Sequence, residues 1–253
     1  MVNTRLIARL DIKGPNLVKG VHLEGMRVLG KPERFARLYY EQGADELIYM
    51  DPVASLYGRN SLLEIIERTS KEIFIPITDG GGIRTIEDIR TVLRAGADKV
   101  AINTAGVNQP SFFSQAAMQF GSSTIVASIE AIKKPDNSYE AFTDNGREGS
   151  GLNAIEWASK TADLGAGEIM VTSIDQEGTG RGFDLELTHQ IATSVNIPVI
   201  ACGGAGKLSD ILDVVSKGNA DAVGMASILH YEALKNFDIV KDEYASEGNT
   251  EYI

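Results

Sequence analysis

Cysteine is almost absent from the chain, since Cys202 is the only one among 253 residues. A single cysteine excludes an internal disulfide and a cysteine-rich metal site. Its place within an apolar run predicts a thiol packed in the core. We expect neither a metal ion nor a cofactor.

Long apolar runs are also absent. No stretch reaches the roughly 18 apolar residues that a membrane-spanning helix needs, and the opening sequence MVNTRLIARLDIKG has no signal-peptide core. We therefore expect no membrane partner and a cytoplasmic location.

Positive charge is in deficit, with 24 Lys and Arg against 35 Asp and Glu and a net charge of -11. Proteins that bind nucleic acid need a basic face, so we expect no nucleic-acid partner. A small phosphorylated substrate stays compatible with this balance, because it needs only local anion sites. The 43% of hydrophobic and 23% of charged residues are typical of a soluble globular protein.

One segment of the chain occurs twice. Residues 75–104 read IPITDGGGIRTIEDIRTVLRAGADKVAINT, and residues 197–227 read IPVIACGGAGKLSDILDVVSKGNADAVGMAS. Each copy predicts a strand, a glycine turn, a helix and a second strand. Glycines after a strand let backbone N–H groups approach an anion, and the N-terminus of the next helix favours negative charge. The repeat therefore predicts two phosphate sites.

Strand and helix patterns alternate along the whole chain. Eight strands are predicted, at Leu6–Leu10, Glu46–Met50, Phe74–Thr78, Lys99–Ile102, Ile125–Ile129, Glu168–Thr172, Pro198–Ala201 and Ala222–Met225. Helices are predicted at Pro32–Gln42, Ser61–Ser70, Ile86–Ala95, Pro110–Phe120, Ala154–Leu164, Leu185–Val195, Leu208–Ser216 and Tyr231–Phe237. This order is typical of an α/β fold, a TIM (β/α)8 barrel, whose usual length is about 250 residues. We expect a single barrel over residues 1–253, built from two (β/α)4 halves at about 1–122 and 123–245.

Two connections are longer than the others, Lys13 to Lys31 and Ala131 to Asn153. Both follow the C-terminal end of a predicted strand, where barrels of this class build active sites and lids. Lys19, in the first connection, would be a movable cation near phosphate or a solvated loop lysine, and the pattern leaves both open.

Each half places one carboxylate at the end of its first strand, Asp11 in the sequence LDIK and Glu130 in IEAIK. Two carboxylates at one barrel mouth can act as general acid and general base. A lone Asp at a strand end can also cap a loop or pair with a nearby lysine, so the signal comes from the two equivalent positions.

Four charged residues stand at strand starts, where barrels are usually apolar: Arg5, Glu46, Lys99 and Glu168. Their alternating signs predict a ring of ion pairs across the barrel floor. From spacing alone, a purely structural network is the favoured interpretation.

Six stretches resemble a known family: LDIK, LVKGV, EQGADEL, IPITDGGGIRTIEDIRTVLRAGADKVAINTA, TSIDQEGTGRGFDLEL and IPVIACGGAG. Through them nearly the full chain resembles the cyclase (synthase) subunit of imidazole glycerol phosphate synthase. The resemblance implies a lyase that receives ammonia from a glutaminase partner docked at the N-terminal face of the barrel. It implies a bisphosphorylated ribulosyl formimino carboxamide ribonucleotide as substrate, converted to imidazole glycerol phosphate and aminoimidazole carboxamide ribonucleotide in histidine biosynthesis.

The resemblance also implies roles for individual residues. Asp11 and Glu130 would be the catalytic pair, and Lys19 would engage the substrate. One phosphate site would comprise Gly82, Asn103 and Thr104, and the other Glu177, Gly178, Gly204, Ala226 and Ser227. The ammonia gate would comprise Arg5, Glu46, Lys99 and Glu168.

The chain departs from the family pattern near the mouth. Glu130 stands where the family usually has Asp, and Arg9 stands where it often has Cys. Such changes are similar to those in paralogues that supply ammonia for the amidation of surface-polysaccharide sugars, which is an alternative function. A sugar-phosphate isomerase of the same half-barrel ancestry is a second alternative, but it would have no use for a gate.

Overall fold

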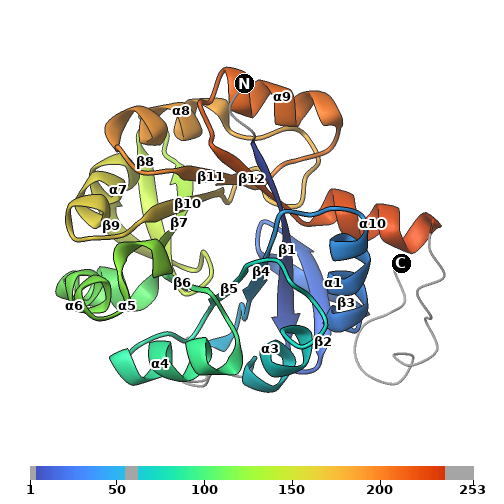
Figure 1. The fold of residues 1–253 in the computed structure, drawn as a ribbon. Helices are drawn as coiled ribbons and strands as arrows, with labels where there is room; N and C mark the ends of the chain where they lie inside the picture. Colours follow the sequence, from blue (N-terminus) through green and yellow to red (C-terminus); the bar gives the residue numbers. More distant parts are fainter. Residues whose placement is uncertain (1–3, 55–61, 237–253) are drawn as a thin grey trace.

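The computed structural model describes residues 4–54 and 62–236, and the structural statements below concern those residues. Eight parallel strands form a closed barrel (Figure 1). In barrel order they are β1 (Arg5–Lys13), β4 (Glu46–Met50), β5 (Ile77–Gly80), β6 (Lys99–Ile102), β7 (Ile125–Lys133), β10 (Glu168–Ser173), β11 (Val199–Cys202) and β12 (Ala222–Met225). Parallel pairing of β12 with β1 and of β7 with β10 closes the ring. The predicted TIM (β/α)8 barrel is confirmed.

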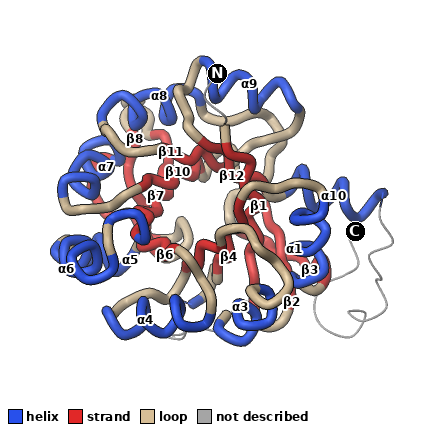
Figure 2. The backbone as a smooth tube through the Cα atoms, viewed as in Figure 1, coloured by secondary structure: helices blue, strands red, loops and turns tan. Residues whose placement is uncertain are grey.

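Helices surround the barrel on its outside (Figure 2). They are α1 (Pro32–Glu41), α3 (Leu63–Thr69), α4 (Ile86–Ala95), α5 (Thr104–Asn108), α6 (Ser111–Phe120), α7 (Ala154–Asp163), α8 (Leu185–Ser194), α9 (Leu208–Ser216) and α10 (Ser227–Asn236), with a 3-10 turn, η1, at Ser122–Thr124. Within the described ranges, no helix has the length and apolar character needed to cross a membrane.

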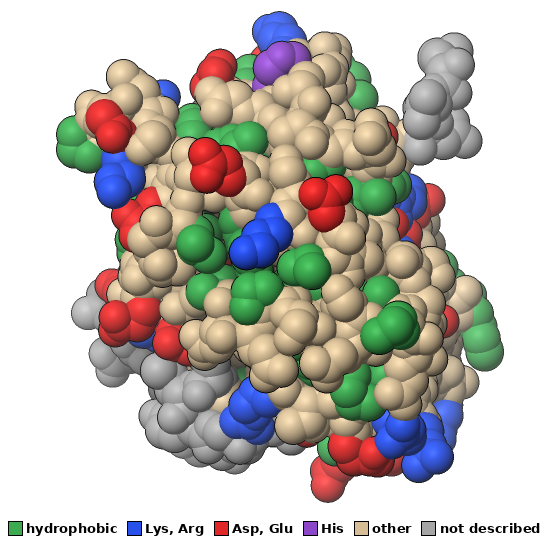
Figure 3. All heavy atoms as spheres, turned by 90° about the vertical axis from the view of Figure 1, so that its left-hand side faces the viewer, with side chains coloured by type: hydrophobic (Ala, Val, Ile, Leu, Met, Phe, Trp, Pro, Cys, Tyr) green, Lys and Arg blue, Asp and Glu red, His purple; other side chains and the backbone are tan. Residues whose placement is uncertain are grey.

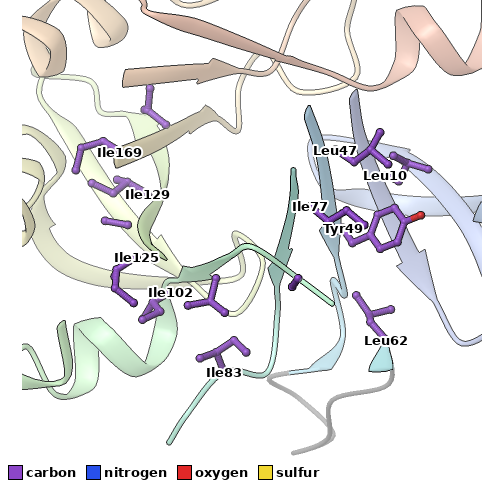
Figure 4. Packing of buried hydrophobic residues seen from close by; sticks show 14 of the residues in the cluster. Leu10, Leu47, Tyr49, Leu62, Ile77, Ile83, Ile102, Ile125, Ile129 and Ile169 are labelled. Carbon is purple, nitrogen blue, oxygen red and sulfur yellow. The ribbon is translucent and has the colours of Figure 1, made fainter. Parts of the chain in front are cut away.

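The core has two layers, because successive side chains along a strand point to opposite faces of the sheet. Leu10, Leu47, Tyr49 and Ile77 belong to the large outer cluster between strands and helices (Figure 4). A second cluster lies inside the barrel and consists of Ile7, Ile48, Met50, Ala101, Val126, Met170, Ile200, Cys202 and Ala222. The expected packing of the Cys202 thiol is thus confirmed.

The two long connections are β-hairpins rather than plain loops. The first holds β2 (Asn16–Val21) and β3 (Glu24–Gly30), and the second holds β8 (Tyr139–Thr143) and β9 (Glu148–Asn153). Each begins by pairing antiparallel with the barrel strand before it, β2 with β1 and β8 with β7. The hairpin tips meet, since Asn145 Nδ2 donates to the carbonyl of Leu23 at 3.2 Å.

Several boundaries differ from the prediction. The third barrel strand begins at Ile77, because Phe74 is 77% exposed and lies outside the ladder. The last helix begins at Ser227 rather than Tyr231, because the strand before it ends at Met225. The short helix α5 was not predicted, and Ser61 and Phe237 lie outside the described residues.

The flank of the barrel that lies to the left in Figure 1 carries side chains of both charge signs, scattered among hydrophobic ones (Figure 3). The excess of acidic residues is not gathered into one patch on this flank.

Candidate active site

The four charged residues at strand starts form the predicted ring of ion pairs. Arg5 Nη1 lies 2.6 Å from Glu46 Oε1 and 2.9 Å from Glu168 Oε1. Lys99 Nζ lies 3.1 Å from Glu46 Oε2 and 3.2 Å from Glu168 Oε2. Each cation thus bridges both carboxylates across the N-terminal end of the barrel. The ring closes the floor with a layer of charge below the inner apolar cluster.

A second charge network lies at the opposite end of the barrel, around Asp11. Arg9 Nε donates to Asp11 Oδ1 at 3.0 Å, and Lys19 Nζ donates to Asp11 Oδ2 at 2.9 Å. Lys19 also donates to Glu177, and Arg9 Nη1 donates to Thr172 Oγ1 at 3.0 Å. All five side chains are buried. Their hydrogen bonds connect the ends of β1, β2 and β10.

The structure corrects one interpretation of Lys19, that of a solvated loop lysine. Lys19 lies in β2 and is only 2% exposed. The hairpin folds back on β1, pairing Val18 with Asp11, so that Lys19 is carried over the barrel mouth. Burial acts to lower the pKa of Lys19, but the charges of Asp11 and Glu177 outweigh it and raise that pKa. Lys19 is a buried cation that is paired with two carboxylates.

The two mouth carboxylates have opposite protonation tendencies. Burial acts to raise the pKa of Asp11, but the charges of Arg9 and Lys19 outweigh it and hold that pKa well below its usual range. Burial raises the pKa of Glu130 to about 7, against the opposing charge of Arg9 and a hydrogen bond from the Gly146 backbone. At neutral pH Asp11 is therefore ionised, while Glu130 is poised between its two forms.

Glu130 faces a cavity of about 340 Å³ between β4 and β7. Asn103 Nδ2 donates to Glu130 Oε2 at 3.2 Å and to the carbonyl of Phe142 at 3.1 Å. The Thr104 hydroxyl accepts from the backbone N–H of Asp144 at 3.1 Å. The cavity brings together all three residues of the first predicted phosphate site, Gly82, Asn103 and Thr104, with other residues of the barrel mouth: Met50, Asp51, Gly81, Ala101, Ser128 and Glu130.

A second cleft lies across the mouth, between β10 and β1, and it is far smaller at about 10 Å³. It brings together the other predicted phosphate residues with the side chain of Arg9: Arg9, Glu177, Gly178, Gly203, Gly204, Ala205, Gly224, Met225, Ala226 and Ser227. Gly203 and Gly204 have φ angles of 92° and 104°, close to the 95° of Gly81 and the 78° of Gly82. A Cβ on Gly204 would lie 2.1 Å from the Gly182 carbonyl, so only glycine fits this turn.

Arg9 is the main site residue that the sequence reasoning left without a role. The signal was present, because an arginine two positions before Asp11 on a strand lies on the same face as Asp11. Within the described part of the chain, no group of His, Cys, Asp and Glu side chains is arranged to hold a metal ion.

Comparison with known proteins agrees with this geometry. Residues 5–235 match the family described as histidine biosynthesis protein. Three relatives carry the name imidazole glycerol phosphate synthase subunit HisF. The one from Legionella pneumophila is 60% identical over 210 residues, which cover 83% of this chain and 99% of that protein. Those from Alkaliphilus metalliredigens and Lactococcus lactis are 47% and 45% identical, over 91% and 96% of this chain and 92% and 94% of theirs. The chain belongs to the histidine biosynthesis protein family.

Proposed function

We propose that this chain is the cyclase subunit of imidazole glycerol phosphate synthase. The observation that carries the proposal is the placement of Asp11 and Glu130 at equivalent strand ends of one mouth. Glu130 lines one glycine-turn cleft, and Asp11 is bonded to Arg9, which lines the other. An elongated substrate with a phosphate at each end fits that layout. The relatives named HisF support the same reaction class.

The two clefts hold the two phosphates of the substrate. Gly82, Asn103 and Thr104 bind one of them. The other lies at the N-terminus of α10 and is bound by the second group, Glu177, Gly178, Gly204, Ala226 and Ser227. Backbone N–H groups of glycine turns and helix N-termini suit phosphate oxygens.

The two carboxylates divide the proton chemistry between them. Asp11 is ionised and stabilises positive charge that develops as ammonia adds to the substrate carbon. Glu130, with its pKa of about 7, carries the proton that is transferred as the carboxamide ribonucleotide leaves and the imidazole ring closes. Asn103 holds the Glu130 carboxyl toward the cavity. A pKa near the working pH suits a group that must both give and regain a proton.

Ammonia comes from a glutaminase subunit docked at the N-terminal face of the barrel. The ring of Arg5, Glu46, Lys99 and Glu168 is the gate at that face, and ammonia moves from it through the barrel to the mouth.

We also propose that residues 1–253 are one barrel, made of half-barrels at about 1–122 and 123–245. The repeated glycine turns and the four barrel strands in each half support this division.

The test is a steady-state assay with ammonium salt and the bisphosphate substrate, without any partner. We expect ammonia-dependent formation of both products. Tight binding of the bisphosphate without turnover would contradict the proposal and favour the amidation alternative.

A further inference from the structure

The side chain of Arg9 crosses the inside of the barrel. Its strand, β1, is separated from β10 by β12 and β11 on the shorter way round the barrel. Arg9 Nη1 nevertheless donates to Thr172 on β10 at 3.0 Å. A side chain that reaches over two intervening strands must pass in front of their inner faces. Arg9 therefore lies beneath the C-terminal ends of β11 and β12.

The guanidinium group of Arg9 has a hydrogen-bonding position left over. Nε donates to Asp11 and Nη1 to Thr172, but Nη2 is buried without a hydrogen-bond partner among the described residues. Arg9 as a whole is only 2% exposed. Burial raises the pKa of the neighbouring Cys202 thiol to about 11, with the Arg9 charge acting against it. A neutral thiol is a weak hydrogen-bond acceptor. Because an unsatisfied buried donor on a charged group is costly, the fold alone does not explain why Nη2 is buried.

Arg9 lines the small cleft that also contains Gly203, Gly204, Ala226 and Ser227. The cleft lies at the N-terminus of the ten-residue helix α10, where the helix dipole favours an anion. Arg9 is the only cationic side chain among its described lining residues, and Glu177 is the only carboxylate. Lys19 already binds Glu177, which reduces the repulsion that this carboxylate would exert on an anion in the cleft.

We propose that Arg9 is a substrate-binding residue, whose Nη2 donates to an oxygen of a phosphate monoester bound over the Gly203–Gly204 turn. The cleft volume of about 10 Å³ is close to that of one water-sized group. One phosphate oxygen therefore enters the cleft toward Arg9, and the other oxygens stay on its outer side, facing the backbone N–H groups. This inference rests on the proposed function only in identifying the phosphate as the substrate's.

The residue at position 9 also makes the two phosphate clefts chemically different. The residue equivalent to Arg9 in the second half is Ser128, two positions before Glu130, and it lines the larger cavity. A phosphate in the first cleft meets a hydroxyl group at this depth, whereas one in the second cleft meets a charged guanidinium. Arg84 also lines the larger cavity, so the contrast concerns the inner barrel, where only a phosphate over Arg9 meets a charge-assisted hydrogen bond from a strand residue.

Inorganic phosphate is the probe for the first experiment. Crystals of wild type, Arg9→Met and Arg9→Lys are soaked over a phosphate series, and calorimetric titration gives affinities in solution. We expect Arg9→Met to weaken phosphate at Gly204 and Ser227 by roughly 10- to 100-fold, with little change at Asn103 and Thr104. Thr104→Val is the matched control, and it should weaken only the other cleft.

The folded state is checked by circular dichroism, because Arg9→Met leaves Asp11 with Lys19 alone. If Arg9→Met does not fold, Arg9→Lys decides the question, since it keeps the charge but lacks the planar group that reaches both Thr172 and the cleft. Unchanged phosphate affinity at Gly204 and Ser227 in the folded variant overturns the proposal.

A second arm distinguishes substrate phosphate from free phosphate. The dissociation constant of the bisphosphate substrate is measured for wild type and Arg9→Met, and a parallel loss of affinity is expected. If inorganic phosphate weakens but the substrate does not, the assignment to substrate phosphate is wrong. Neither arm needs turnover, so failure of the proposed reaction and failure of this inference remain distinguishable.

Discussion

The two halves of the barrel share their backbone turns but differ in what lies beneath them. Gly81 and Gly203 follow equivalent strands with nearly equal φ angles of 95° and 92°. Below the first turn lies a cavity of about 340 Å³, and below the second a cleft of about 10 Å³. The backbone repeat is preserved, while the inner side chains have diverged.

Two pairs of equivalent residues carry this difference. Arg9 corresponds to Ser128, and Thr172 corresponds to Met50. Arg9 reaches Thr172 and fills its side of the barrel, whereas Ser128 and Met50 line an open cavity. One long side chain therefore makes two similar glycine turns chemically unequal without changing the fold.

The two carboxylates at the barrel mouth, Asp11 and Glu130, also differ in their hydrogen-bond partners. Asp11 receives hydrogen bonds from two cations, whereas Glu130 receives them from neutral groups, the Asn103 amide and the Gly146 backbone. We expect Asp11→Asn to lower ammonia-dependent turnover by roughly 10³-fold, because it removes the ionised member of the pair. Affinity for the bisphosphate should stay within a few-fold, since the phosphates dominate binding.

Steady-state kinetics and a direct binding titration on the same Asp11→Asn preparation check this prediction. An equal loss in affinity and in turnover would assign Asp11 a binding or structural role.

The second prediction concerns Glu130. If it acts as the proton donor, kcat/KM should fall as pH rises through about 7. Glu130→Gln should lower turnover by roughly 10²-fold or more. Glu130→Asp should lower turnover by up to about 10²-fold, because the carboxyl group is drawn back by one methylene. Turnover of the three proteins is measured over a pH series, and a Gln variant as fast as wild type would exclude Glu130 from acid–base chemistry.

The same group makes stability depend on pH. Between the usual pKa of 4.5 and the folded pKa of about 7, the unfolded chain ionises while the folded protein stays protonated. The contribution is therefore fully present below pH 4.5 and is lost as pH rises through about 7, up to roughly 3 kcal/mol. Glu130→Gln should be more stable than wild type at pH 8 and differ little at pH 5. Urea unfolding at both pH values measures this, and equal pH dependence in the two proteins would contradict it.

The ring of ion pairs at the barrel floor is also unequal between the halves. Glu46 and Glu168 are equivalent, but Lys99 corresponds to Ala222, so the repeat supplies only one lysine. Lys99→Ala should change glutamine-dependent turnover in the presence of the glutaminase by several-fold, because the gate loses a bridge. Turnover with ammonium salt should change little, and the ratio of the two rates is the measurement. A proportional loss of both rates would indicate a structural role alone.

Much of the fold was predictable from the sequence. Strand and helix alternation, the repeated glycine turns and the ring of charged strand starts all depend on local pattern, and the structure confirms them. The hairpin strands were not predicted. The turn His22–Leu23 has positive φ angles without the Gly or Asn that usually indicate them, whereas the Asn145-Gly146 pair of the second turn was a hairpin signal that was missed. Lys19 was misjudged for the same reason, because its burial depends on where the hairpin folds. For Arg9 the local pattern indicates only its place on the same face as Asp11, whereas its contact with Thr172, 163 positions away, depends on the closed barrel.

The last prediction concerns the helix that follows each glycine turn. In the first half the Thr85 hydroxyl accepts from the backbone N–H of Asp88 at 3.1 Å, and Asp88 Oδ2 accepts from the backbone N–H of Thr85 at 2.8 Å. In the second half Asp210 Oδ2 accepts from Lys207 N–H at 3.0 Å, but a lysine side chain has no acceptor to return the bond.

Lys207 has the extended backbone, φ -154° and ψ 163°, that an N-cap residue needs, and it is exposed. Lys207→Thr should therefore complete the capping box and stabilise the protein by about 0.5 to 1 kcal/mol, while Thr85→Ala should destabilise it by about 1 kcal/mol. Urea unfolding of both variants beside wild type measures the two effects, and Lys207→Ala serves as the control for loss of the lysine charge. A threonine variant no more stable than the alanine variant would show that the second turn cannot use the cap, and that the halves differ in backbone as well as in side chains.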